Sequence, residues 1–181
     1  MGIWFTSDTH FGSERTRQLS KRDFYSITSM DEAMINNWNN NIDKYDTVYH
    51  LGDFGDYYNA KELNGEIILI LGNYDREEYY NNKELFKDFK QVITEDVHRI
   101  WIHHNNKRYD INMAHEPSKL DKFRNINEIN LFGHIHKLQM VKPFGLNVGT
   151  DCHDFTPVDL DTVIFYDNAI RNYYDDEVFI K

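Results

Sequence analysis

Short runs of β-branched and aromatic residues recur along the chain, and turn or polar residues separate them. The runs at residues 3–7, 47–51 and 67–71 predict three strands, because apolar runs of this length bounded by turn residues are typical of buried strands. Residues 99–103 and 109–114 flank Asn105-Asn106, and asparagine tolerates positive φ, so these two runs predict a hairpin. Shorter strands are predicted at residues 130–132, 139–142, 146–148, 162–166 and 170–174.

Helical periodicity appears between the first two predicted strands. Apolar residues recur there at steps of three or four, which places them on one helix face: Met30, Ala33, Met34, Trp38 and Ile42. Ser29 and Glu32 have the spacing of a capping box and predict the start of this helix. Two more helices are predicted, at residues 82–90, with Leu85, Phe86 and Phe89 inward, and from residue 118 to about residue 127.

The order of these elements predicts an α/β fold. Strand and helix alternate early in the chain, and strands and hairpins follow, which favours a mixed sandwich of sheets and helices. The 181 residues, 40% apolar and 28% charged, fit one globular domain, residues 1–181. The longest apolar run, residues 67–71, is far too short to cross a bilayer, so no membrane association is expected.

Charge and cysteine content narrow the classes of partner. The net charge of −10 argues against non-specific binding of nucleic acid, which needs a basic surface. The single cysteine, Cys152, allows neither an internal disulfide nor a zinc site built from cysteines, which favours a reducing compartment, the cytoplasm. The sequence does not indicate an oligomeric state.

Nearly every strand that the pattern predicts to be buried ends in a short cluster rich in Asp, Asn and His. The clusters are Ser7-Asp8-Thr9-His10, Gly52-Asp53-Phe54-Gly55-Asp56, Gly72-Asn73-Tyr74-Asp75, Ala114-His115-Glu116 and Gly133-His134-Ile135-His136. Ligands of open α/β sheets bind beyond the carboxyl ends of the strands, so the clusters should converge in space. A glycine before several of the polar residues would permit the sharp turn that aims the next side chain.

The side chains in these clusters have the chemistry of metal ligands. Two aspartates, one asparagine and four histidines offer oxygen and imidazole donors without a thiolate. That mixture suits divalent ions such as Mn²⁺, Fe²⁺ or Zn²⁺, with Ni²⁺ as a further alternative. Seven such ligands are too many for one ion and suit two ions that share a carboxylate.

The ordered motifs resemble those of the calcineurin-like metallophosphoesterase superfamily. They are Asp-x-His, Gly-Asp-x-x-Asp, Gly-Asn-x-Asp, a lone His and Gly-His-x-His, from Asp8 to His136. The segment from Asn147 to Val158 also resembles the end of small single-domain bacterial and phage members. The resemblance implies a four-layer α/β/β/α sandwich of two mixed β-sheets flanked by helices.

The resemblance also implies a ligand set and a reaction. One ion would be held by Asp8, His10, Asp53 and His136, and the second by Asp53, Asn73, His115 and His134. Two divalent ions about 3.5–4 Å apart lower the pKa of a bridging water and clamp phosphoryl oxygens. The expected activity is therefore hydrolysis of a phosphodiester or small phosphomonoester by the bridging hydroxide, with Mn²⁺ as the expected ion.

One position departs from the family pattern. A histidine usually follows the asparagine, where it protonates the leaving group together with the second aspartate of Gly-Asp-x-x-Asp. Here Tyr74 stands in its place, while Asp56 is present. An unperturbed tyrosine has a pKa of about 10, poorly matched to neutral pH. Either Tyr74 substitutes, another group such as Asp75 or a histidine serves as the acid, or activity is low.

These observations leave alternative functions open. A metal-containing binding or regulatory module with weak catalysis is consistent with Tyr74. A nuclease of the same superfamily is another alternative, although the net charge opposes it. A dinuclear hydrolase of another ester or amide is disfavoured because the ordered motifs match phosphoesterases.

A basic cluster follows the first motif: Arg15, Arg17, Lys21 and Arg22. It is either a solvated loop or a clamp for the substrate phosphate, in which Arg15 and Arg17, with Asn73, are the candidate substrate contacts. His50, in a predicted strand, is expected to be a packed residue. His98, His103 and His104 are expected at exposed hairpin positions, and Cys152 as a small buried residue. A place for Asp151 and His153 in the pocket is a minor alternative.

Overall fold

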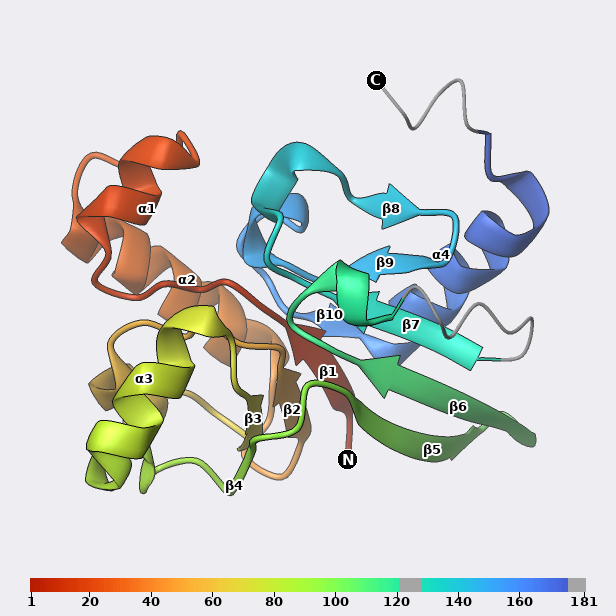
Figure 1. Ribbon diagram of the computed structural model, residues 1–181, viewed down its shortest axis with the longest axis horizontal. Helices are drawn as coiled ribbons and strands as arrows, with labels where there is room; N and C mark the ends of the chain where they lie inside the picture. The colour runs from red at the N-terminus through yellow and green to blue at the C-terminus, as the bar shows by residue number, and fades with distance from the viewer. Residues whose placement is uncertain (121–127, 176–181) are drawn as a thin grey trace.

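The computed structural model describes residues 1–120 and 128–175, and this part of the chain forms two five-stranded β-sheets packed face to face (Figure 1). The strand order is β10-β1-β2-β3-β4 in the first sheet and β5-β6-β7-β9-β8 in the second. Each sheet mixes parallel and antiparallel pairs. Two mixed sheets with flanking helices confirm the fold class predicted from the sequence.

The first sheet contains the three strands that the apolar runs at residues 3–7, 47–51 and 67–71 predicted, and two short strands, β4 and β10, that no run predicted. β1 (Ile3–Thr6), β2 (Thr47–His50), β3 (Glu66–Ile70) and β4 (Gln91–Ile93) are parallel, and β10 (Val158–Asp159) pairs antiparallel with β1. β3 is buried on both faces. Ile67 and Leu69 pack with residues of the helical layer, whereas Ile68 and Ile70 pack with residues of the second sheet.

The second sheet begins with the predicted hairpin. β5 (His98–His104) and β6 (Lys107–Met113) are antiparallel, and Asn105 and Asn106 at the turn both have positive φ. β7 (Glu128–Phe132) and β9 (Gly145–Asn147) continue the sheet in parallel, and β8 (Val141–Lys142) closes it antiparallel to β9. β6 and β7 therefore end on the same side, which carries two of the polar clusters.

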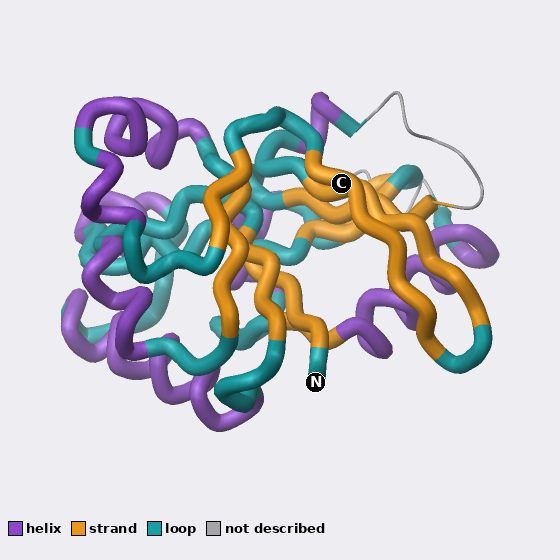
Figure 2. The backbone as a smooth tube through the Cα atoms, turned by 90° about the horizontal axis from the view of Figure 1, so that it is seen from below, coloured by secondary structure: helices purple, strands orange, loops and turns teal. Residues whose placement is uncertain are grey.

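Helices lie on both sides of the strands. α1 (Glu14–Leu19), α2 (Ile27–Asn41) and α3 (Asn73–Asn81) gather on one side, and α4 (Leu160–Tyr173) packs against β1, β9 and β10 (Figures 1 and 2). The predicted apolar face of α2 is buried at Met30, Met34 and Trp38. Its predicted cap was wrong. The capping box joins Ser26 and Ser29, one turn earlier than the predicted pair of Ser29 and Glu32.

The predicted strands at residues 162–166 and 170–174 were wrong, because both fall in α4. β-branched and aromatic residues at 162–166 favour a strand locally. Asp159 overrides that preference by accepting hydrogen bonds from the backbone N–H and the hydroxyl of Thr162, both at 2.8 Å, which caps a helix. Burial at Leu160, Val163 and Ile170 has helical spacing and fixes the helix against the sheets.

The helix predicted at residues 82–90 was also wrong. The α-helix of this region is α3, and a short 3₁₀ helix, η2 (Lys83–Phe86), follows it. Phe86 and Phe89 are nevertheless buried, as their spacing predicted. The helix predicted from residue 118 to about residue 127 lies mostly outside the described residues, and its first two residues fall in the 3₁₀ helix η3 (Pro117–Lys119).

Three further 3₁₀ helices follow strand ends or glycine turns: η1 (Tyr57–Glu62), η4 (His136–Leu138) and η5 (Thr150–Cys152). Within residues 1–120 and 128–175, no helix is long and apolar enough to cross a membrane.

Candidate metal centre

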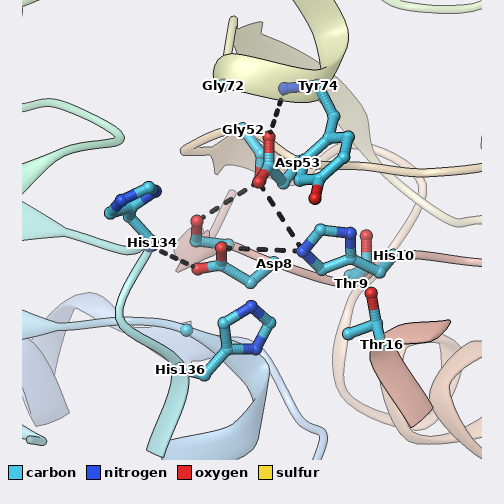
Figure 3. Close-up of polar contacts among 12 residues, drawn as sticks. Asp8, Thr9, His10, Thr16, Gly52, Asp53, Gly72, Tyr74, His134 and His136 are labelled. Atoms are coloured by element: carbon cyan, nitrogen blue, oxygen red, sulfur yellow. Dashed lines mark hydrogen bonds and ion pairs between the residues drawn. The ribbon is translucent and has the colours of Figure 1, made fainter. Parts of the chain in front are cut away.

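The polar clusters at the strand ends lie together, as the parallel strand directions predicted. The Asp8 N–H donates to the carbonyl oxygen of Gly52 at 2.9 Å, which ties the end of β1 to the end of β2. The Gly133 N–H donates to the carbonyl oxygen of His115 at 3.0 Å, which ties the ends of β7 and β6. Figure 3 shows side chains from both sheets pointing into one space.

Two groups of ligand atoms occupy this space. Asp8, His10 and His136 form the first, here named group A, and Asp53, His115 and His134 form the second, named group B. Within each group the three ligand atoms lie within 4.8 Å of one another. The resemblance implied the same two sets with two additions: Asn73 in the second set, and Asp53 in the first set as well as the second.

Asn73 joins group B. Its side-chain oxygen Oδ1 lies 2.9 Å from His115 Nε2 and 3.1 Å from His134 Nδ1, and the two imidazole nitrogens are 3.1 Å apart. Asn73 is the first residue of α3, so the start of the helix fixes where its amide points. An amide oxygen and two imidazole nitrogens are thus directed at one point.

Asp53 lies between the two groups. Its Oδ2 is 3.6 Å from His10 Nε2 of group A and 3.3 Å from His115 Nε2 of group B. Its other oxygen, Oδ1, accepts a hydrogen bond from the Tyr74 N–H at 3.0 Å, at the amino end of α3 (Figure 3). One oxygen is therefore held by the helix and the other faces both groups.

The buried polar atoms of group A fit a bound cation. Asp8 Oδ1 and His10 Nε2 are buried and lie 4.0 Å apart, and within the described part of the chain neither has a hydrogen-bond partner. A buried polar atom left unsatisfied costs about 1–3 kcal/mol. A divalent ion between a carboxylate oxygen and an imidazole nitrogen would satisfy both atoms, and their chemistry suits Mn²⁺, Fe²⁺ or Zn²⁺.

Five of the ligand residues have left-handed backbone conformations. The φ angles are 57° at Asp8, 48° at His10, 56° at Asp53, 70° at His134 and 48° at His136. Such conformations cost about 1–3 kcal/mol each and persist where the surrounding structure imposes them, often at functional sites. The strand-end loops therefore hold these side chains in place at the expense of local stability.

The glycines before the ligands serve close packing more than turning. Gly52 has a φ of 91° and contacts the backbone of Gly72, where any side chain would clash. At Gly133, a Cβ would collide with the side chains of Ser7 and Asp8. The glycines thus let the loops from separate strands approach one another, which brings the ligand residues together.

The ligands differ in how strongly they hold protons. Burial lowers the pKa of His10 to about 4, against the charges of Asp8 and Asp53, so this imidazole is neutral near pH 7. Burial acts in the same direction on His115, but the hydrogen bond with Asp53 and the charges of Asp8 and Asp53 raise the pKa of His115 to about 9. A protonated imidazole cannot bind a metal, so protons compete with metal ions for His115.

Two ligand histidines are oriented through their second nitrogen. His115 Nδ1 donates to the carbonyl oxygen of Leu51 at 2.8 Å. His136 Nδ1 donates to Asp151 Oδ2 at 2.7 Å. Such contacts fix the tautomer that leaves Nε2 free for a metal. A place for Asp151 in the pocket was only a minor alternative, because nothing in the motif order links Asp151 to His136.

The candidate acids lie at three different places. The Tyr74 side chain is 58% exposed and its ring meets that of His10 edge-on, with centroids 5.6 Å apart. Asp56 is exposed and accepts a hydrogen bond from the backbone of Tyr58. Asp75 is fully buried. Its two oxygens accept from four donors: the backbone N–H groups of Asp53, Phe54 and Gly72 and the Tyr57 hydroxyl.

The contacts of Asp75 give it a role that the motif alone did not reveal. As the third residue of α3, it joins the loop that carries Asp53 to the start of the helix that carries Asn73. Every donor around it points at the carboxylate, so Asp75 acts as a brace between two ligand-bearing segments. An acid three residues after Gly72 is a helix-start signal that the sequence interpretation overlooked.

The basic cluster separates into three environments. Arg15 is exposed and lines a pocket of about 280 Å³ together with His10 and Tyr74. Arg17 makes a two-pronged contact with Glu14 on α1, at 3.0 and 2.7 Å. Arg22 is buried and contacts Asp151. Lys21 is exposed, as Arg15 is. The predicted loop was wrong for Arg15 and Arg17, which lie on α1, and the predicted solvent exposure was wrong for Arg22.

Of the remaining histidines, His50 and His103 have the environments that were predicted, whereas the predicted exposure was wrong for His98 and His104. His50 is fully buried and its Nε2 lies 2.9 Å from the Thr9 hydroxyl, and burial lowers the pKa of His50 to about 3. His103 is exposed, whereas His98 and His104 are half-buried. His153 is half-buried and donates to the carbonyl oxygen of Asn147 at 2.7 Å. Cys152 is half-buried, and burial raises the pKa of its thiol to about 12.

One solved structure superposes on this chain over most of its length, and another matches only weakly. The protein of unknown function AQ665 from Aquifex aeolicus superposes with a TM-score of 0.70, and the match covers 91% of this chain and 98% of that one at 22% identity. Likeness at this identity shows the fold alone. A novel archaeal phosphodiesterase matches over 82% of each chain at 22% identity with a TM-score of 0.43, too low to support an argument.

Sequence comparisons identify the family. The uncharacterized protein MJ1445 of Methanocaldococcus jannaschii is 28% identical over 178 residues, which cover 90% of this chain and 89% of the relative. The family model of the calcineurin-like phosphoesterase superfamily domain matches residues 1–156, and these residues include every member of groups A and B. The chain therefore belongs to the calcineurin-like phosphoesterase superfamily, whose members are metal-dependent phosphoesterases.

Proposed function

We propose that the protein is a dinuclear metal-dependent phosphodiesterase or phosphomonoesterase that hydrolyses small phosphate esters with a hydroxide derived from water. Group A with Asp53 would hold one ion, and group B with Asn73 the other. The observation that carries the proposal is the place of Asp53 Oδ2, 3.6 Å from a nitrogen of group A and 3.3 Å from a nitrogen of group B. Mn²⁺ is the ion that we propose.

The charges of the ligands suit a phosphate substrate. Two divalent ions lower the pKa of a water molecule between them and neutralise the charge of the phosphoryl group. Asp8 and Asp53 are the two carboxylates of the proposed ligand set, and Asn73 and the histidines are neutral when they bind. The ligands therefore leave a surplus of positive charge for a phosphate, although the chain as a whole carries −10.

The pocket beside His10 is the proposed place for the leaving group. Arg15 and Tyr74 line it together with Ser13, Thr16 and Glu78. Arg15 offers a guanidinium at the surface of this pocket, suited to an oxygen of the phosphate or the leaving group. Arg17 is engaged by Glu14 and by the carbonyl oxygen of Phe24, so the proposal gives the substrate contact to Arg15 alone.

A second candidate function is a metal-containing binding module with weak catalysis. The specific observation that favours it is Tyr74, which stands where a histidine acid is usual and is 58% exposed, while the Asp56 carboxylate accepts a hydrogen bond from the backbone of Tyr58. An enzyme without a matched acid would still turn over esters whose leaving groups need no proton.

Hydrolysis of bis-p-nitrophenyl phosphate tests the proposal. The purified protein with Mn²⁺ should release p-nitrophenolate, and excess chelator should stop the reaction. Asp53→Asn should abolish turnover, because the oxygen shared by both groups loses its charge. Asp161→Asn, on the exposed face of α4, is the matched control and should retain turnover. If the wild type binds two ions but releases no p-nitrophenolate, the result would favour the metal-containing binding module.

A further inference from the structure

Arg22 is a fully buried cation beside group A. Its guanidinium donates to both oxygens of Asp151, at 2.9 and 2.8 Å. It also donates to the backbone carbonyl oxygens of Asp8 and Thr9, at 2.6 and 2.7 Å. A buried arginine is tolerated only when its donors are satisfied in this way. The proposed reaction assigns no role to Arg22.

Asp151 links Arg22 to His136 of group A. Its side chain is 2% exposed, and besides Arg22 it accepts the Nδ1–H of His136. A carboxylate only accepts hydrogen bonds, so it fixes the proton of His136 on Nδ1 and leaves Nε2 to face the metal. The Ser20 hydroxyl, two residues before Arg22, lies 3.2 Å from the same Nδ1.

Arg22 also acts on the opposite wall of group A. Asp8 and His10 both have positive φ, and the carbonyl oxygens of Asp8 and Thr9, between them, point at the guanidinium. Hydrogen bonds to these two oxygens favour the strained backbone that aims Asp8 and His10. One side chain therefore joins the two segments that supply group A.

We infer that Arg22 and Asp151 are positioning residues that set the geometry of group A and thereby the affinity of one of the two ion sites. The inference rests on the proposed function, because it concerns the same two ion sites. Group B is supported differently: His115 Nδ1 donates to the backbone oxygen of Leu51, and Asn73 is fixed by the start of α3. Loss of the pair should therefore weaken group A and spare group B.

The charge of the pair explains why both members are needed. A guanidinium close to a cation site repels the cation unless a carboxylate neutralises it. Asp151→Asn leaves the guanidinium unpaired and weakens the hold on His136. Arg22→Lys keeps the positive charge, but a compact ammonium with three donors cannot reproduce the planar fork that serves four oxygens. The two substitutions thus disturb group A by different routes.

Binding of Mn²⁺ tests the inference without reference to activity. Equilibrium dialysis over a range of free Mn²⁺, with elemental analysis, gives the number of ions and their Kd values. The wild type should bind two ions. In Asp151→Asn and Arg22→Lys one ion should keep its wild-type Kd and the other should bind about 10–100-fold more weakly. Electron paramagnetic resonance should then show isolated Mn²⁺ in place of a coupled pair at intermediate Mn²⁺.

A control separates positioning from general loss of stability. Ile42→Ala removes a side chain that is 1% exposed and packs in the core around α2. This variant should unfold more easily but bind both ions with wild-type Kd values. Circular dichroism confirms the fold of every variant before dialysis, and if Arg22→Lys does not fold, the nearly isosteric Asp151→Asn decides.

Unchanged Kd values in the folded variants would overturn the inference, whether the wild type binds two ions or one. Failure of the proposed function would be seen separately, in the number of ions that the wild type binds. Two ions bound with unchanged Kd values in the folded variants would show that the pair positions nothing. A wild type that binds one ion would refute the two-ion proposal instead. In that case the inference stands if Asp151→Asn weakens the single ion, and falls if its Kd is unchanged.

Discussion

Groups A and B offer similar ligand chemistry, but the fold supports them in different ways. In group A all three residues have positive φ, Asp8 and His10 are buried, and a buried ion pair orients His136. In group B, His115 is oriented by a backbone oxygen, and His134 and Asn73 are exposed. Group A is therefore the more enclosed site, whereas group B is more open to solvent, and both contain strained residues, because Asp53 and His134 of group B also have positive φ.

This difference indicates how groups A and B respond to substitution of their residues. A ligand that is buried and has no alternative partner, such as Asp8 Oδ1, cannot be replaced by water without rearrangement. An exposed ligand such as His134 lies where water can take its place. We therefore expect losses in group A to be larger than losses in group B.

Among the substitutions that compare the two groups, the largest expected effect is that of Asp8→Asn. This change removes the charge of one of the two carboxylates and leaves a single side-chain oxygen, where Asp8 has one oxygen for the His134 N–H at 2.8 Å and one that faces group A, so it disturbs both groups. Loss of several kcal/mol of charge stabilisation predicts a fall in kcat/KM of about a thousandfold or more. His134→Gln should cost about 10–100-fold, because a water can replace the lost nitrogen. Steady-state kinetics with bis-p-nitrophenyl phosphate measures both variants.

The comparison would fail if the order of these losses were reversed. A larger loss in His134→Gln than in Asp8→Asn would make the exposed group the one that controls catalysis. Elemental analysis of both variants distinguishes a lost ion from a misplaced one. Asp161→Asn again serves as the control for a change of charge away from the site.

Much of this contrast is absent from the sequence pattern. The order of the polar clusters predicted which residues converge, because parallel strands end on the same side of a sheet. The pattern contained no signal for the pairing of Arg22 with Asp151, which lie 129 residues apart along the chain. Contacts of this kind depend on how two loops meet after folding, and no local preference encodes them.

The errors in the predicted secondary structure also arise because contacts formed on folding override local preferences. The run at residues 162–166 is rich in β-branched and aromatic residues, yet the cap at Asp159 and burial at Val163 make it helical. The start of α3 was not predicted, because Asn73 and Asp75 belong to a ligand motif. Both residue types occur in turns as well as at helix starts. Tertiary packing decided between two local preferences that the sequence left nearly balanced.

Tyr74 lies between the two groups, and its replacement by histidine has the next largest expected effect on turnover. Its N–H donates to Asp53, and its ring contacts His10. Tyr74→His should supply an acid whose pKa is matched to neutral pH, and raise turnover of esters with poor leaving groups about a hundredfold. A p-nitrophenolate ester should gain little, because this leaving group needs no proton. Equal gains on both substrates would contradict a role in leaving-group protonation.

The smallest expected effect is a difference in proton release between the groups. Near pH 7 His10 is already neutral, because burial lowers its pKa to about 4. His115 is protonated in the ion-free protein, because the hydrogen bond and charge of Asp53 outweigh burial and raise its pKa to about 9. An ion entering group B must therefore displace a proton from His115. In group A, His10 gives up none, but the hydrogen bond with Asp151 and the charges of Asp8 and Asp151 outweigh burial and raise the pKa of His136, so protons compete with the ion there through His136.

The sign of the pH dependence follows from this displacement. Where His115 is protonated and binding releases its proton, affinity for the group B ion should weaken about tenfold for each pH unit lowered below the pKa of His115. Calorimetric Mn²⁺ titrations in two buffers with different ionisation enthalpies measure the protons released per ion. Asp151→Asn sharpens the assignment, because it should weaken the group A ion and leave the His115 proton release in place. Binding to group B that is independent of pH between 6 and 8 would show that His115 is already neutral, and would remove this distinction between the groups.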